Sequence, residues 1–170
     1  GRAIGEEAVG EGVDLVLGPG VNLKRGPLCG RNFEYFSEDP LLAGKLGAAW
    51  VRGLQSAGPG ACVKHFAAYG APQAGREYHA VDMSERVFRD SYLPPYRAAL
   101  DAGAATVMTS FNDLDGVPAT ANRWLLRNLL RDELGFGGFV VTDYGTIGEL
   151  KAHGVAADDR QAAERALRAG

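Results

Sequence analysis

The chain has 170 residues, 46% of them hydrophobic, which is enough for about one ordinary domain with a sizeable core. Its formal net charge of -3 at pH 7 and its lack of a basic block argue against nucleic acid or an anionic membrane as the main partner. A small neutral ligand fits this charge better. No apolar stretch approaches the roughly 20 residues that a membrane-spanning helix needs.

Two further features bound the chemistry and the context. Cys29 and Cys62 have neither a metal-site spacing nor a disulfide framework, so we expect packed thiols. The chain does not begin with Met and starts within a predicted helix, so we expect an excerpt of a longer protein. Its localisation, whether periplasmic, secreted or cytoplasmic, is therefore left open.

Helices and strands alternate along the chain. Apolar runs that stop at Gly, Pro or a polar residue predict strands at residues 13–17, 61–66, 104–110 and 139–144. Helices are predicted at residues 3–11, 40–57, 84–103, 123–134, 146–153 and 158–169.

Local signals support several of these helices. Asp39 followed by Pro40 predicts the start of the second helix, and Asn122 predicts a cap on the fourth. The third helix should start at Ser84 and restart at a Pro-Pro pair. Within the second helix, apolar residues recur at near-helical spacing, at Leu42, Leu46, Ala49 and Leu54.

This alternation predicts parallel strands joined by right-handed crossovers, with the carboxyl ends of all strands at one rim. A closed eight-stranded barrel of this kind takes about 250 residues, so four strands would make half of one, with an open edge on each side. A complete doubly wound sheet is the alternative, but no strand opens a Gly-rich phosphate-binding motif. The sequence therefore predicts an α/β fold, a partial (β/α)8 TIM-type barrel of about four consecutive βα units.

The last predicted strand, 139–144, stops on a carboxylate, Asp143. The carboxyl end of a parallel strand is where α/β enzymes keep their catalytic residues. The alternative is that Asp143 only caps the helix that follows near Thr146.

The polar residues at the other strand ends and on the long loop would gather at the same rim, namely Arg31, Lys64, His65 and Asn112. Together with Asp143 they suit a carbohydrate, whose hydroxyls both donate and accept, backed by aromatic faces such as Phe66, Tyr69, Phe111 and Tyr144. No metal is expected, because the three histidines lie on separate segments without ligand spacing.

Each of these residues also has a structural interpretation. Arg31 and Lys64 could form ion pairs with Glu34 or Glu38, and His65 could be a packed core histidine. Neighbouring residues of a strand point to opposite faces, so Lys64 and His65 can both line a site only if the strand bends or ends between them.

Several motifs, in order over essentially the whole chain, carry a resemblance to a known family. They are Gly30-Arg31-Asn32-Phe33-Glu34, Ser37-Glu38-Asp39-Pro40, Val63-Lys64-His65-Phe66-Ala67-Ala68-Tyr69-Gly70, Tyr78 with Val81-Asp82-Met83-Ser84, Leu93-Pro94-Pro95-Tyr96, and Val140-Val141-Thr142-Asp143-Tyr144. The chain resembles the N-terminal domain of glycoside hydrolase family 3, in its bacterial β-glucosidase branch.

The resemblance implies a retaining β-glycosidase that hydrolyses terminal non-reducing β-D-glucosyl residues of a small β-glucoside or oligosaccharide, without a cofactor. Asp143 would be the nucleophile and would form a covalent glycosyl intermediate. The substrate-binding residues would be Arg31, Lys64, His65, Met108, Phe111 and Tyr144.

The resemblance also implies that part of the machinery lies elsewhere. Residues 1–170 would be a single partial domain, the central part of the barrel, and the family's acid/base Glu usually lies in a following domain. The protein would then need the rest of its own polypeptide for proton transfer, and the 170 residues alone should be inactive.

Two positions depart from the family pattern, and the exact activity stays open. Phe111 stands where many relatives have Tyr, and Tyr144 where Trp is common. The β-N-acetylhexosaminidase branch takes its acid/base from an Asp-His pair on a loop where this chain has Glu77 and His79, but it follows Lys-His-Phe with Pro-Gly-His-Gly rather than with residues 67–70 of this chain. A β-xylosidase, an arabinosidase and a non-catalytic sugar-binding module are also compatible with these motifs.

Overall fold

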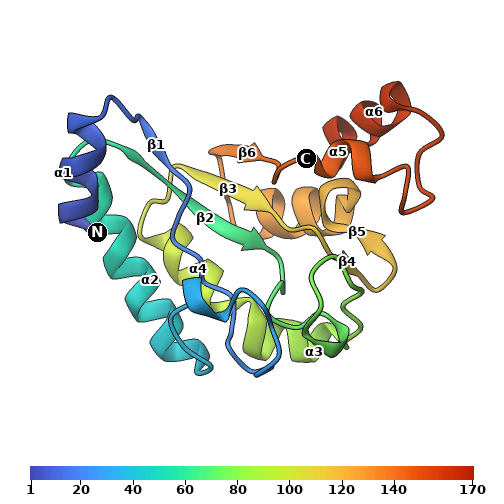
Figure 1. The fold of residues 1–170 in the computed structure, drawn as a ribbon, viewed down its shortest axis with the longest axis horizontal. Helices are drawn as coiled ribbons and strands as arrows, with labels where there is room; N and C mark the ends of the chain where they lie inside the picture. Colours follow the sequence, from blue (N-terminus) through green and yellow to red (C-terminus); the bar gives the residue numbers. More distant parts are fainter.

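The computed structural model describes every residue from 1 to 170. Its main sheet has four strands in the order β1-β2-β3-β6, and each neighbouring pair is parallel. The strands are β1 (Leu15–Val16), β2 (Gly60–Phe66), β3 (Thr106–Thr109) and β6 (Phe139–Val141) (Figure 1). Successive units stand side by side, so the predicted α/β sheet of four parallel strands is confirmed.

Helical segments connect the strands. The α-helices are α1 (Arg2–Gly10), α2 (Pro40–Gln55), α3 (Glu85–Val87), α4 (Pro94–Asp101), α5 (Thr146–Glu149) and α6 (Asp159–Ala169). Two π-helical segments are η3 (Phe88–Tyr92) and η5 (Trp124–Glu133), and the 3-10 turns are η1 (Asn32–Glu34), η2 (Gln73–Gly75) and η4 (Ala119–Ala121). Helices α2 and α4 lie side by side and contact β2, while α1 packs on α2 (Figure 1). None of these helices combines the length and the apolar character that crossing a bilayer requires.

The predicted helix starts are confirmed. The Asp39 carboxylate accepts a hydrogen bond of 2.6 Å from the Leu42 N–H at the start of α2, and Pro40 is the first helical residue. The Asn122 amide oxygen accepts one of 3.0 Å from the Leu125 N–H. These bonds satisfy amide groups that have no partner inside the helix.

The buried face of α2 differs from the apolar pattern in the sequence. Leu42 and Leu46 are exposed, and the helix buries mainly small residues, namely Ala43, Gly44, Gly47, Ala48, Val51 and Leu54. A Cβ on Gly44 would lie 3.2 Å from the Ala98 Cβ of α4, and one on Gly47 only 2.8 Å from Val21. Around Gly44 and Gly47 the helix approaches its neighbours too closely for leucine, so Leu42 and Leu46 point outward, whereas Leu54 in the last turn is buried.

Several elements are shorter than predicted, and one was missed. Strand 139–144 ends at Val141, and helix 146–153 ends at Glu149. The missed element is a hairpin of β4 (Asp113–Leu114) and β5 (Val117–Pro118). Its turn residues, Asp115 and Gly116, have φ values of 52° and 84°, and an Asp-Gly pair is a strong hairpin signal that could have found it.

The core lies between the sheet and its helices, and the sheet has an open edge at β1 and another at β6. Cys29 and Cys62 are both buried, as predicted for packed thiols. At the β6 edge, Phe139 is 67% exposed and borders a groove of about 570 Å³ that is largely apolar. Two open edges are what four units of a larger barrel would have.

Candidate active site

The segment that follows β1 stays hydrogen-bonded to β2. Three backbone hydrogen bonds of 2.8 to 3.0 Å join residues 18–21 to residues 62–64. The chain therefore continues beside β2 after β1 has ended, and it delivers Asn22 to the side of His65. Gly20 permits this arrangement, because a Cβ there would lie within 3.0 Å of the segment that follows η1.

Asp143 follows β6 by two residues and its side chain is only 14% exposed. Its Oδ1 accepts a hydrogen bond of 2.7 Å from the Tyr144 N–H. Its Oδ2 has no hydrogen-bond partner and lies 3.5 Å from His65 Nε2 and 3.8 Å from Arg31 Nη1. The helix-cap interpretation was wrong, since Gly145 occupies the cap position of α5 and no side chain caps it.

Arg31 and Lys64 share one carboxylate. Arg31 Nε forms an ion pair with Glu34, whose other oxygen lies 3.0 Å from Lys64 Nζ. The three side chains are only 15 to 21% exposed. The ion-pair alternative therefore holds for Glu34 and not for Glu38, which forms no salt bridge. Arg31 nevertheless also reaches Asp143, whereas Lys64 Nζ lies more than 4 Å from any Asp143 oxygen.

The guanidinium of Arg31 stays charged in this setting. Burial alone would lower the pKa of Arg31, but the hydrogen bond and charge of Glu34, helped by Asp143, outweigh it and raise that pKa. Glu77 adds a further contact, with its carboxylate 3.4 Å from Arg31 Nε.

His65 is both a buried residue and a site residue. It is fully buried, yet its Nε2 faces Asp143. The register of β2 against β3 shifts between Val63 and Phe66. The strand is thus irregular at this point, and both side chains reach the carboxylates of the site. Burial, reinforced by Arg31 and Lys64, lowers the pKa of His65 to about 2, so the ring is neutral near pH 7.

The other residues expected to line the site have varied surroundings. Met108 is buried on β3, opposite Val141 of β6. Phe111 is also buried, with its ring 4.4 Å from that of Tyr78 and 5.8 Å from that of Tyr69. Tyr144, in contrast, is 92% exposed.

Two residues that the sequence placed at the rim have structural contacts instead. Asn112 is fully buried, and its amide donates to the backbone oxygens of Ala67 and Asp113. Phe66 is also buried and packs edge-on against Tyr96, with the ring centroids 5.1 Å apart.

Sequence reasoning missed the polar network behind His65, which consists of Asn22, Tyr35 and Tyr96. All three are at most 3% exposed. Asn22 carried a signal, because it is the first polar side chain after the first strand. Nothing in the local sequence marks Tyr35 or Tyr96 as its partners.

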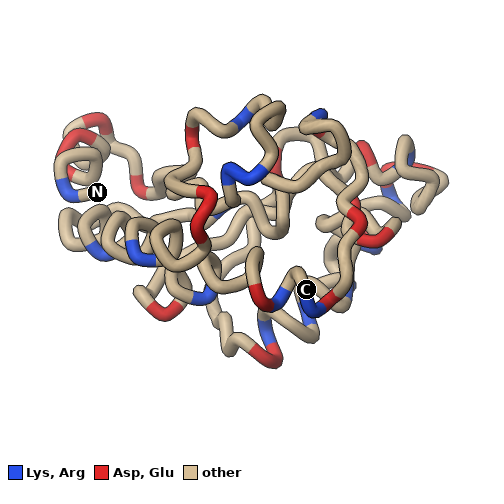
Figure 2. Tube along the Cα trace, turned by 90° about the horizontal axis from the view of Figure 1, so that it is seen from below, with Lys and Arg blue, Asp and Glu red and all other residues tan.

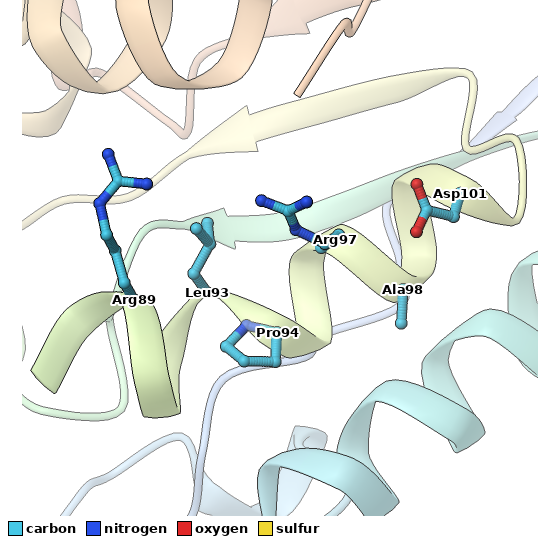
Figure 3. Close-up of a pocket in the computed structure, with 6 residues that line it drawn as sticks. All are labelled: Arg89, Leu93, Pro94, Arg97, Ala98 and Asp101. Atoms are coloured by element: carbon cyan, nitrogen blue, oxygen red, sulfur yellow. The ribbon is translucent and has the colours of Figure 1, made fainter. Parts of the chain in front are cut away.

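Charged groups elsewhere form structural pairs. Lys and Arg are interspersed with Asp and Glu along much of the chain (Figure 2). A pocket of about 370 Å³ on η3 and α4 is bordered by Arg89 and Arg97, which extend from the same side of this helical segment (Figure 3). Both arginines pair with Glu133 of η5, at 2.6 and 3.7 Å. No group of three or more His, Cys, Asp or Glu side chains is arranged to hold a metal ion.

Comparison with protein families decides the relationship. The model described as the glycosyl hydrolase family 3 N terminal domain matches residues 1–170. The chain belongs to glycosyl hydrolase family 3. The resemblance seen in the motifs is thereby confirmed over the whole chain.

Individual members of family 3 are similar at high identity. The periplasmic beta-glucosidase of Salmonella typhimurium is 46% identical over 177 residues, covering 100% of this chain and 23% of that protein. The exo-alpha-(1->6)-L-arabinopyranosidase of Bifidobacterium longum is 45% identical over 146 residues, covering 85% of this chain and 19% of that protein.

A solved family 3 structure confirms the fold class. The crystal structure of beta-glucosidase from Listeria innocua in complex with isofagomine superposes with a TM-score of 0.97 at 43% identity, over 99% of this chain and 25% of that one. The partial TIM-type barrel is thus confirmed. The chain spans about a quarter or less of the length of these relatives.

Proposed function

We propose that the intact protein is a retaining β-glycosidase of the β-glucosidase type, acting on terminal non-reducing β-D-glucosyl residues with Asp143 as its nucleophile. The observation that carries this proposal is the environment of the Asp143 carboxylate. One oxygen is fixed by the Tyr144 N–H, and the other is unpartnered and faces Arg31 and His65. A carboxylate held in this way has one oxygen free to attack an anomeric carbon.

The surrounding groups suit the first half of such a reaction. Asp143 Oδ2 would form a bond to the anomeric carbon while the leaving oxygen receives a proton, and water would then release the sugar. Arg31 and Lys64 are the fixed cations near this point, and charged donors make strong hydrogen bonds to sugar hydroxyls. Glu34 holds both cations, so their positions are set before a substrate arrives.

The second carboxyl group of the reaction would come from outside residues 1–170. Retaining hydrolysis needs two carboxyl groups about 5 to 5.5 Å apart, of which one transfers the proton. The open edges of the sheet and the small share of each relative that is covered support the idea that the chain is the central part of a larger barrel. We infer that a following domain of the same polypeptide supplies the acid/base, and that residues 1–170 alone do not hydrolyse p-nitrophenyl β-glucoside.

Among the possible sugars, the comparisons favour glucose. Relatives named as beta-glucosidases support the main proposal, and the arabinopyranosidase and a relative named beta-xylosidase support pentose alternatives. The hexosaminidase alternative has less support, because Glu77 pairs with Arg31 and His79 is exposed. A small β-glucoside or oligosaccharide is the proposed substrate.

Trapping of the covalent intermediate tests the proposal. The intact enzyme is incubated with an activated 2-deoxy-2-fluoro-β-glucoside, digested and analysed by mass spectrometry. We expect time-dependent inactivation and one labelled peptide that carries the sugar on Asp143, while Asp143→Asn takes up no label. Label on another carboxylate, such as Glu77 or Glu149, would refute the assignment.

A further inference from the structure

The ring of His65 has two different sides. Its Nε2 faces the Asp143 carboxylate, 3.5 Å from Oδ2, and neither atom has a hydrogen-bond partner. Its Nδ1 faces the interior, 3.4 Å from Asn22 Nδ2 and 3.3 Å from the Tyr35 hydroxyl. Which of the two ring nitrogens carries the proton decides what His65 presents to the site.

The orientation of the Asn22 amide is fixed from behind. Its Oδ1 lies 3.0 Å from the backbone N–H of Tyr69, and it also contacts the Tyr96 hydroxyl. A backbone N–H can only donate, so the atom that faces Tyr69 must be the amide oxygen. The amide nitrogen of Asn22 therefore points at His65.

This orientation sets the tautomer of the ring. Asn22 Nδ2 can only donate, so His65 Nδ1 must accept and cannot carry a proton. We propose that Asn22 is a positioning residue that holds His65 in the Nε2–H tautomer, with that proton directed at Asp143 and at a sugar hydroxyl bound beside it. The function of the tautomer rests on the glycosidase proposal above, whereas the tautomer itself does not.

The remaining neighbours of the ring agree with a single, neutral tautomer. The titratable and charged groups that face it are Arg31, Tyr35, Lys64, Tyr69 and Asp143. Asp143 would favour a second ring proton, but burial together with Arg31 and Lys64 opposes it and keeps the pKa of His65 low. The Tyr35 hydroxyl can rotate to donate to Nδ1 as well.

The tautomer matters for the proposed reaction. A neutral Nε2–H can donate to the nucleophile or to a hydroxyl without placing a full positive charge beside the anomeric carbon, where positive charge develops. The opposite tautomer would direct a lone pair at the Asp143 carboxylate and repel it. Asn22 would thus act on the reaction through His65, without touching the sugar.

Neutron diffraction on a deuterated crystal of the intact enzyme tests the assignment directly. We expect deuterium on His65 Nε2 and none on Nδ1, with a deuterium of the Asn22 amide directed at Nδ1. Deuterium on Nδ1 would overturn the proposal. This measurement does not depend on activity. The tautomer assignment can therefore be refuted even if Asp143 is the nucleophile, and confirmed even if Asp143 is not.

Asn22→Asp tests the effect on catalysis in the intact enzyme, because a carboxylate at this position accepts from Nδ1 instead of donating to it. In this variant the His65 ring is doubly protonated and charged below its new pKa. Above that pKa the single ring proton is on Nδ1 instead of Nε2. We expect kcat/KM to fall on the order of 100-fold or more at every pH, since a wrong histidine tautomer is costly in hydrolases. A new ionisation should also appear in the kcat/KM profile.

The matched control is Asn122→Asp, which makes the same change at another buried amide, where a carboxylate still caps η5. It should keep the wild-type pH profile. If Asn22→Asp folds and its profile has the wild-type shape, the positioning role of Asn22 is wrong. If Asn22→Asp does not fold, the neutron structure of the wild-type enzyme decides.

Discussion

The two ends of the site differ in how completely this chain builds them. At the β1 and β2 end, Asn22, Tyr35 and His65 are at most 3% exposed and joined by hydrogen bonds. At the β6 end, Tyr144 is 92% exposed and Phe139 is 67% exposed. His65, one of the residues proposed to bind the sugar, is thus fixed within these 170 residues, whereas Asp143, the proposed nucleophile, lies next to an open edge of the sheet. Changes at the two ends should therefore have different consequences for stability and for activity.

The largest effect is expected at the β6 end, from Asp143→Asn in the intact enzyme. The amide keeps an acceptor for the Tyr144 N–H but cannot attack as a carboxylate does. We expect kcat on p-nitrophenyl β-glucoside to fall on the order of 10⁴-fold or more, as removal of a nucleophile does in other hydrolases. Steady-state kinetics measure this, with circular dichroism to follow the melting temperature.

The control for this loss is Asp132→Asn. Asp132 is exposed and makes one surface ion pair, of 3.4 Å with Arg127, which contributes about 0 to 1 kcal/mol. The Asp132→Asn variant should retain the wild-type kcat. If Asp143→Asn kept more than a tenth of the wild-type kcat, Asp143 could not be the nucleophile.

At the β1 and β2 end, Glu34→Gln should lower both the stability and the activity of the enzyme. It removes the negative charge between Arg31 and Lys64 and leaves two largely buried cations close together. Breaking such a pair costs about 3 to 5 kcal/mol of unfolding free energy. We also expect kcat/KM to fall roughly 10- to 100-fold, mainly through KM, because both cations lose their fixed positions.

Glu38→Gln is the matched control, since Glu38 is exposed and forms no salt bridge. Urea unfolding and steady-state kinetics compare the two variants. Equal effects of Glu34→Gln and Glu38→Gln would show that Glu34 does not organise the cations.

His65, at the β1 and β2 end of the site, should also make the protein sensitive to acid. The pKa of His65 is lowered from 6.5 to about 2 in the folded state, so the unfolded state binds one more proton between these values. Stability linked to His65 is therefore fully present above pH 6.5 and is lost as the pH falls toward 2. His65→Gln should flatten the decline of melting temperature between pH 6.5 and 4, as measured by scanning calorimetry.

The variant His79→Gln, which removes an exposed histidine, gives the reference slope for this experiment. Some decline will remain in every variant because other groups titrate in this range. If His65→Gln and His79→Gln decline with the same slope, His65 is not held neutral.

The sequence predicted the sheet, the helix starts and the place of Asp143, because each follows from local patterns and the handedness of βα units. Asp143 was found as the polar residue at a strand end, and the same rule, applied to the first strand, would have found Asn22. The choice of Glu34 over Glu38 as the partner of Lys64 depends on how η1 lies against β2, which no local pattern records.

The buried face of α2 and the network behind His65 have a common physical origin. Leu42 and Leu46 form an apolar pattern, but the distance between α2 and its neighbours decides which face is buried. Similarly, Tyr96 meets Asn22 across 74 residues of sequence. Contacts of this range are set by packing, which a single sequence does not display.

The smallest expected effect lies at the most exposed position of the site. Tyr144 is 92% exposed, so Tyr144→Ala should change the free energy of unfolding of the protein by less than about 0.5 kcal/mol. If its ring stacks on a bound sugar, as the family resemblance implies, the same change should raise KM by about three- to tenfold, while Tyr144→Trp should leave KM equal or lower it. An unchanged KM in Tyr144→Ala would remove Tyr144 from the site. A loss of stability would instead mean that the intact protein buries this ring against chain that lies beyond the open edge of β6.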